Sequence, residues 1–131
     1  MRMCAAVVVG ACALLTGTAG AEIHSDDPAV HLNYATILFY KGRGQMGQGQ
    51  ADAATVTFQE MEAELNLAMT LSERDADDQR RQLLRSQTAF LLGDLHFFVF
   101  KERDKAKAFY EESIKNFPEH HGAAEALKRF E

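Results

Sequence analysis

Cysteine and proline are both scarce in this chain of 131 residues, which has two of each. Two cysteines cannot make a disulfide scaffold, and two prolines exclude a collagen-like or proline-rich protein. Basic residues are also in the minority, because 14 Lys and Arg stand against 19 Asp and Glu; the formal net charge of −5 argues against a nucleic-acid partner. The length allows one domain, and a hydrophobic content of 47% is typical of a globular protein.

The first 21 residues have the pattern of a secretory signal peptide. Arg2 is the only charge before Glu22, and the apolar run over residues 5–15 is shorter than a membrane anchor needs. Small residues follow this run and end in Ala19-Gly20-Ala21, the A-x-A motif at which signal peptidase cleaves. We therefore expect residues 1–21 to be a signal peptide, residues 22–131 to be the mature domain, and the periplasm to be its location.

A second cleavage site is present upstream. Residues 9–12, Val-Gly-Ala-Cys, resemble the lipobox at which bacterial lipoproteins are processed and lipidated. Lipidation of Cys12 would make the protein an envelope-anchored lipoprotein, and only in that case do we expect it to associate with a membrane. With cleavage after Ala21, both cysteines leave with the leader, and the mature chain has no thiol that an oxidising compartment could cross-link.

Apolar residues recur at helical spacing throughout the mature chain, and no segment alternates with period two. We therefore predict an all-α domain of five antiparallel helices with short connections. The first helix has Asp26 or Asp27 as its cap and Pro28 in its first turn, and it ends near Gly42. Residues 42–50, with four glycines and three glutamines, are expected to form a flexible loop. The later helices start near residue 52, run from 77 or 78 to about 100, span about 104–116, and follow Pro118.

The second helix pair carries the elements of a repeat. Two aromatics around a Leu-Gly pair, an A-x₃-F element and a closing proline follow in order, at Phe90, Leu92-Gly93, Phe97, Ala106, Tyr110 and Pro118. In these residues the chain resembles the tetratricopeptide repeat (TPR) family. Residues 31–43 match the opening half of the same repeat, whereas the next helix aligns only through Ala68, about fourteen residues late. The resemblance implies antiparallel helix-turn-helix repeats, about two units followed by a C-terminal capping helix.

For function, the resemblance implies a protein–protein interaction adaptor or scaffold of the bacterial cell envelope. In TPR proteins the first helix of each repeat lines a groove for a peptide or partner helix. The matching positions of this sequence are Leu32, Thr36, Phe39, Leu91, Leu95 and Phe98. The Lys and Asn set with which family members clamp an acidic C-terminus is missing, so we expect an apolar ligand. An exposed Leu95 should tolerate the change Leu95→Asp, whereas Phe97→Asp should unfold the domain.

No catalytic centre and no bound cofactor are expected. Residues 42–47 match G-x-G-x-x-G, but a dinucleotide site needs a buried strand before that motif, and none is predicted. The chain has no G-x-S-x-G motif, and the mature part has no cysteine nucleophile. The histidines are expected to be structural or solvated, with His31 packed against the next helix.

Two other functions stay open. Cleavage after Ala21 would make His24 the third residue of the mature chain, where its imidazole, two backbone amides and the terminal amine suit square-planar Cu(II) or Ni(II). The protein would then be a periplasmic metal-binding protein. Alternatively, the domain is a purely structural homo-oligomer, because two repeats bury little surface and repeat proteins usually stack more.

Overall fold

The computed structural model describes residues 25–131, and within that range the chain is helical with no strand. The elements are α2 (Pro28–Gly47), α3 (Ala51–Ser72), α4 (Asp78–Asp94), the π-helical segment η2 (Leu95–Val99), α5 (Arg103–Asn116), α6 (His121–Leu127) and the short 3₁₀ segment η3 (Lys128–Phe130). The all-α prediction is confirmed. The expected signal peptide, Cys12 and His24 lie outside the described residues.

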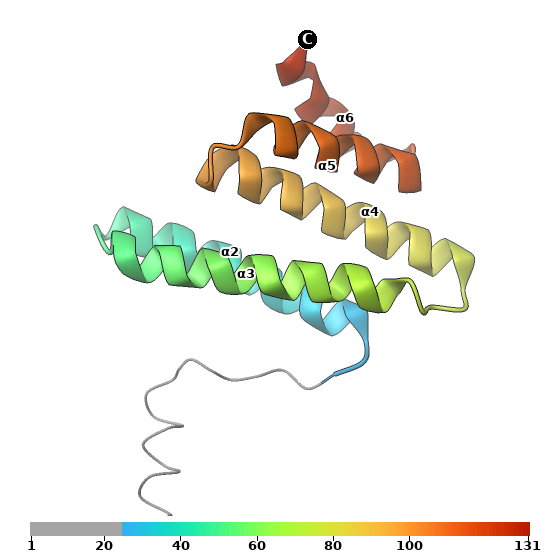
Figure 1. Ribbon diagram of the computed structural model, residues 1–131, viewed down its shortest axis with the longest axis horizontal. Helices are drawn as coiled ribbons and strands as arrows, with labels where there is room; N and C mark the ends of the chain where they lie inside the picture. Colours follow the sequence, from blue (N-terminus) through green and yellow to red (C-terminus); the bar gives the residue numbers. More distant parts are fainter. Residues whose placement is uncertain (1–24) are drawn as a thin grey trace, which may run out of the picture.

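Two antiparallel hairpins are stacked in this fold (Figure 1). The first consists of α2 and α3, the second of α4 and α5, and α6 packs against α5 on the side away from the first hairpin. The α2–α3 and α4–α5 turns lie at the same end of the molecule, whereas the α3–α4 connection lies at the other end. Helix α4 contacts both α3 and α2, so the two hairpins share one interface.

The beginnings of α2 and α4 are fixed by aspartate caps, as the sequence predicts. The Asp27 carboxylate accepts a hydrogen bond from the Ala29 amide (3.0 Å), and the Asp77 carboxylate accepts from the amides of Gln79 and Arg80 (3.0 and 3.1 Å). The Arg80 guanidinium also donates to Asp27 (2.8 Å), which joins the two helix starts. This guanidinium, together with the bond from the Ala29 amide, lowers the pKa of the Asp27 carboxyl.

The prediction of a flexible loop over residues 42–50 is wrong, because α2 continues through Gly47. The side-chain oxygen of Gln45 accepts a hydrogen bond from the Thr57 hydroxyl (2.7 Å), which attaches this glycine-rich end of α2 to α3. The helix then ends in a Schellman turn, in which the Gln50 amide donates to the Gln45 carbonyl (2.8 Å) and the Gly49 amide to the Met46 carbonyl (3.1 Å). Gly49 has a φ of 75°, which a residue without Cβ adopts at little cost.

Each hairpin closes on a contact between a glycine in its first helix and an aromatic ring in its second. A Cβ at Gly42 would lie 2.6 Å from the Phe58 ring, and one at Gly93 would lie 2.5 Å from the Tyr110 ring. Both rings are buried, at 3% and 0% exposure. Only a glycine lets the ring lie this close to the helix backbone, so these two positions set the spacing within each hairpin.

Small polar side chains also bring α4 and α5 together, closer to the start of α4 than Gly93. The Ser86 hydroxyl donates to the Ser113 carbonyl, and the Ser113 hydroxyl donates to the Ser86 carbonyl, both at 2.8 Å. Both serines are fully buried. Because each hydroxyl is satisfied by the opposite backbone, the helices approach closely without leaving a buried donor unpaired.

The hydrophobic core is made of two clusters. The larger fills the space between the first hairpin and α4, and its fully buried centre includes Met61, Leu65 and Leu95. The smaller lies between α5, α6 and the outer side of α4, around Tyr110, with Phe97 partly buried against it as the sequence predicts.

The contact at Gly42 predicts that alanine has opposite effects at two positions of α2, Gly42 and Gly44. Gly42→Ala should lower the free energy of unfolding by about 1–3 kcal/mol, because the new methyl group meets the Phe58 ring. Gly93→Ala should do the same against Tyr110. Gly44→Ala is the matched control: its Cβ meets nothing within 4 Å, so the variant should be more stable by about 0.5–1 kcal/mol. Urea denaturation followed by circular dichroism measures all three, and equal stability of the Gly42 and Gly44 variants would contradict the contact.

Candidate interaction groove

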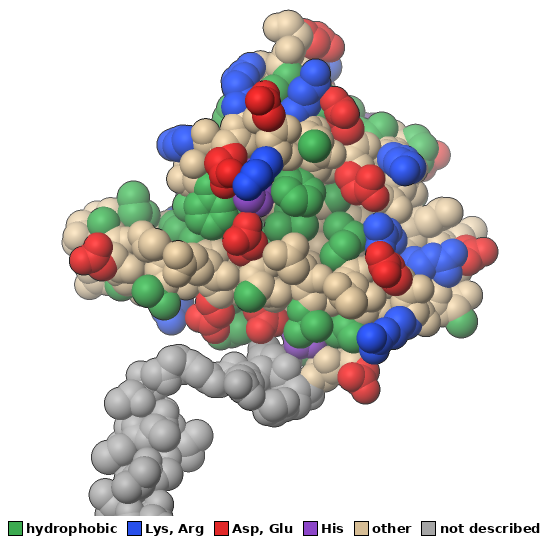
Figure 2. All heavy atoms as spheres, viewed as in Figure 1, with side chains coloured by type: hydrophobic (Ala, Val, Ile, Leu, Met, Phe, Trp, Pro, Cys, Tyr) green, Lys and Arg blue, Asp and Glu red, His purple; other side chains and the backbone are tan. Residues whose placement is uncertain are grey.

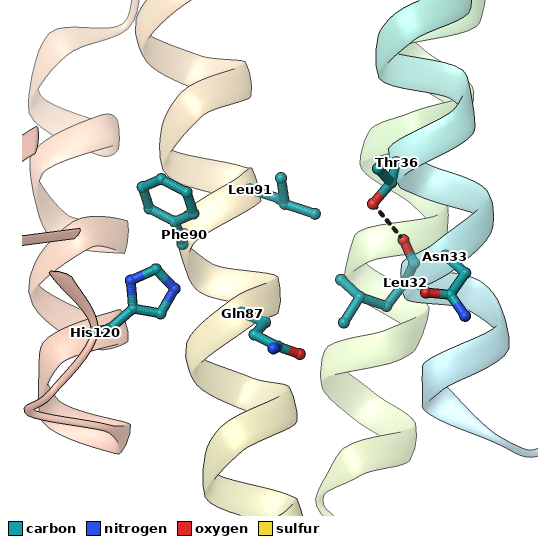
Figure 3. A pocket seen from close by; sticks show the side chains of 7 residues that line it. All are labelled: Leu32, Asn33, Thr36, Gln87, Phe90, Leu91 and His120. Atoms are coloured by element: carbon teal, nitrogen blue, oxygen red, sulfur yellow. Dashed lines mark hydrogen bonds between the residues drawn. The ribbon is translucent and has the colours of Figure 1, made fainter. Parts of the chain in front are cut away.

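A small polar hollow lies between α2 and α4. It has a volume of about 290 Å³. Figure 3 shows three side chains from α2 on one side, three from α4 on the other and the imidazole of His120, at the start of α6, beyond them. The lining residues are Leu32, Asn33, Thr36, Gln87, Phe90, Leu91 and His120. We call this hollow the polar end of the groove.

A larger and mostly apolar hollow lies toward the α2–α3 and α4–α5 turns. Its volume is about 740 Å³. Figure 2 shows one face of the molecule, on which hydrophobic side chains gather between the two hairpins with charged side chains around them. The lining residues are Phe39, Arg43, Met46, Ala51, Thr55, Phe58, Asp94, Phe98, Val99, Phe100 and Lys101. We call it the aromatic end.

The two hollows are successive parts of one groove along α2 and α4. On α2 their lining residues step by four and three, through positions 32, 36, 39, 43 and 46, which is the spacing of a single helix face. On α4 the positions 87, 91, 94 and 98 follow the same rule into η2. At about 1.5 Å per residue, positions 32 to 46 extend over roughly 21 Å.

Five of the six residues predicted from the sequence line this groove. Leu32, Thr36 and Leu91 lie at the polar end, and Phe39 and Phe98 lie at the aromatic end. Phe98 is 45% exposed, which is unusual for so large an apolar side chain.

The prediction for Leu95 is wrong. Its side chain is fully buried in the larger core cluster and lines neither hollow. Each step of four residues turns about 40° past a full turn, and the lining positions stay on one face because steps of four and three alternate. Two successive steps of four, from Gln87 through Leu91 to Leu95, rotate Leu95 by about 80° and into the core between the hairpins. The sequence does not reveal that rotation, because residues 89–100 are apolar on almost every side.

The π-helical turn at η2 was missed by the sequence analysis. The Phe100 amide donates to the Leu95 carbonyl, five residues back, at 3.1 Å. Within this turn His96 points inward and is only 4% exposed, while Phe98 reaches the groove. Such a turn depends on tertiary contacts, and no residue pattern in the sequence marks it.

His96 joins three elements behind the aromatic end. Its two ring nitrogens lie 3.1 Å from Glu62 of α3 and 3.1 Å from Glu102 beside α5. Its ring stacks on Phe109 and meets the edge of Phe100, with centroids 5.2 Å apart in each case. These contacts hold η2 against both hairpins and thereby fix the floor of the groove.

Within residues 25–131, Asp94 is the only acidic residue that lines the groove. It accepts a hydrogen bond from the Tyr110 hydroxyl (2.6 Å), so the ring that closes the second hairpin is anchored at the groove. Burial raises the pKa of the Asp94 carboxyl, partly offset by this bond, and burial together with the neighbouring carboxylate raises the pKa of the Tyr110 hydroxyl.

His31 is buried between α2 and α3, as the sequence predicts. One ring nitrogen lies 2.5 Å from the Glu64 carboxylate and the other 2.8 Å from the Ser25 carbonyl. Burial lowers the pKa of this imidazole, but the Ser25 carbonyl and the Glu64 carboxylate together raise it above its ordinary value of 6.5. The imidazolium is therefore stabilised in the folded state.

Comparisons with known proteins do not identify the chain: no family model, no curated protein and no solved structure matches it. Across residues 25–131, no three His, Cys, Asp or Glu side chains are grouped as metal ligands would be. None of the helices in that range is both long and apolar enough to cross a membrane.

The position of Leu95 reverses the expected result of an aspartate substitution there. Leu95→Asp should unfold the domain, because an unpaired carboxylate in the core costs several kcal/mol against a total stability of roughly 5–10 kcal/mol. Phe98 is 45% exposed at the groove. Phe98→Asp should therefore keep the helical circular dichroism spectrum and melt within a few degrees of the parent. Equal melting temperatures for both variants would contradict the assignment of Leu95 to the core.

The His31–Glu64 pair predicts a pH-dependent stability. Since the folded state raises the pKa of His31, the stabilisation is complete below about pH 6.5 and is lost as the pH rises through the raised value. His31→Gln should therefore lose more stability relative to the parent at about pH 6 than at about pH 9. Urea titrations at the two pH values measure this difference in the free energy of unfolding. A loss of stability in His31→Gln that grows with pH would contradict the pairing.

Proposed function

We propose that this protein is a TPR-like interaction module that binds an apolar peptide or partner helix in the α2–α4 groove. The observation that carries the proposal is the pair of hollows that follow one face of α2 and one face of α4. It combines a sizeable hollow with large apolar side chains left partly exposed to solvent, and such surfaces mark interaction sites.

The repeat interpretation is supported by matching contacts in the two hairpins. The first half of α3 contains Ala54 and Phe58, and the first half of α5 contains Ala106 and Tyr110. The alanine and the aromatic are four residues apart in each pair, and both alanines are fully buried. Each aromatic rests on a glycine of the preceding helix. In this alignment Ala54 takes the place for which the sequence suggested Ala68, and α6 is the capping helix.

We also propose that the module acts as an adaptor in the bacterial envelope. The apolar run over residues 5–15 and the Ala19-Gly20-Ala21 motif support export. Thiol-free residues 22–131 suit an oxidising compartment. Among the described residues, the groove lining includes one histidine and one carboxylate, and these lie at different ends.

Site-specific photo-cross-linking in envelope extracts tests the groove. A photoreactive residue at Asn33 or Gln87, which are exposed on opposite walls, should give the same discrete cross-linked product. The same residue at Glu111, exposed on α5, is the control and should give none. Adding Phe98→Asp should remove the product, because the apolar contact at the aromatic end is lost.

A product from Glu111 equal to that from Asn33, or a product that persists with Phe98→Asp, would contradict the groove as binding site. A product of twice the chain mass would favour the homo-oligomer instead. Ile37 and Tyr40 supply a reason to consider it: they are 62% and 67% exposed on a neighbouring face of α2.

A further inference from the structure

We propose that the aromatic end of the groove takes an amphipathic helix whose apolar stripe is flanked by acidic side chains. This inference rests on the proposed function and specifies its partner. It follows from three features of the aromatic end: its floor, its two basic side chains and the backbone at Lys101.

The floor favours a helix over an extended peptide. It is formed by apolar side chains, chiefly the rings of Phe39, Phe58 and Phe98. The neutral hydroxyl in the lining, that of Thr55, already donates to the Ala51 carbonyl (3.0 Å). An extended segment would leave its peptide groups without partners on such a floor, whereas a helix satisfies them internally. Anchors at i, i+3, i+4 and i+7 would reach the floor from one helix face.

The edge of the aromatic end selects for acidic groups. Arg43 and Lys101 line it, and neither takes part in an ion pair among the described residues. Six of the 13 Lys and Arg side chains in residues 25–131 are paired, such as Arg80 with Asp27 and Lys105 with Glu102; Arg43 and Lys101 are the two unpaired bases that line this hollow. In a chain with a net charge of −5, two such cations beside an apolar floor form a local positive site.

The acidic side chain at this end is held by a hydrogen bond to the core side of the hollow. Asp94 is the acidic residue among those lining the hollow, and its carboxylate accepts the Tyr110 hydroxyl at 2.6 Å. The Arg43 guanidinium instead lies over the Phe39 ring, 5.7 Å from its centroid, which keeps the cation next to the apolar floor.

The backbone holds Lys101 at this edge against its own preference. Its φ of 58° is in the left-handed region, where glycine or asparagine is favoured. The residues on either side enforce the conformation, since the Phe100 amide donates to Leu95 and the Glu102 amide donates to the His96 carbonyl (2.8 Å). Lys101 thus occupies the left-handed position that ends the helix, and this turn places it at the edge of the hollow.

Two synthetic peptides test the charge requirement. Each has about 18 residues, long enough to form a helix, with Leu at i, i+3, i+4 and i+7; the stripe is flanked by Glu in one peptide and by Lys in the other. Fluorescence anisotropy with the purified protein should give a dissociation constant about tenfold lower for the Glu peptide than for the Lys peptide. Raising the salt concentration should narrow this difference.

Charge reversal at one position should reverse the preference. Lys101→Glu should weaken binding of the Glu peptide and strengthen binding of the Lys peptide. Lys115→Glu is the same change at an exposed position of α5, and it should leave both dissociation constants within about twofold of the parent values. Phe98→Asp should abolish binding of both peptides. Circular dichroism of each variant confirms that it is folded.

The outcomes separate this inference from the proposed function. Equal affinity for the two peptides, lost in both with Phe98→Asp, would overturn the acidic partner and keep the groove. If Phe98→Asp leaves the binding of either peptide unchanged, the groove is not the binding site, and the proposed function is overturned as well. A third outcome combines two results: the protein sediments with phosphatidylglycerol vesicles, Lys101→Glu abolishes this sedimentation, and the two peptides bind equally well. This outcome would assign the site to a lipid surface and overturn the proposal of an acidic helix as partner.

Discussion

An aromatic ring lies against the helix backbone at a glycine in each hairpin, and the separation of the helices follows from these two contacts. At Gly42 and Gly93 even one added carbon would come within 2.6 Å of Phe58 or Tyr110. The first helices of the two hairpins, α2 and α4, face each other across the polar end of the groove (Figure 3). Tyr110 also reaches Asp94, so the contact that closes the second hairpin ends at the groove itself. Packing and candidate function thus share residues.

Features that depend on neighbours in the chain could be predicted from the sequence. Asp27 and Asp77 cap amides two or three residues away, and Pro28 suits the first turn of any helix. The end of α2 depends instead on residues of α3. Gly42 continues the helix because Phe58 packs on it, and Gln45 is held by Thr57, so the glycine content alone gave the wrong expectation of a loop.

The residues of the candidate site likewise include some that the sequence could predict and some that only the folded arrangement reveals. The resemblance to a repeat was sufficient to place Leu32 and Phe39 on one wall of the groove and Leu91 and Phe98 on the other. Leu95 was misplaced because an apolar segment does not tell which of its sides meets α3, and the π-helical turn that follows has no sequence signature. Arg43 and Lys101 were not singled out either. Their importance lies in having no acidic partner at the edge of an apolar hollow, which only the folded arrangement reveals.

The central claim is that the faces of α2 and α4 form one binding surface for a helix, and nuclear magnetic resonance tests it most directly. With the acidic peptide bound to isotope-labelled protein, intermolecular nuclear Overhauser effects should connect the peptide leucine methyl groups to the ring protons of Phe39, Phe58 and Phe98. Effects confined to Ile37 and Tyr40, on the neighbouring face of α2, would contradict the account.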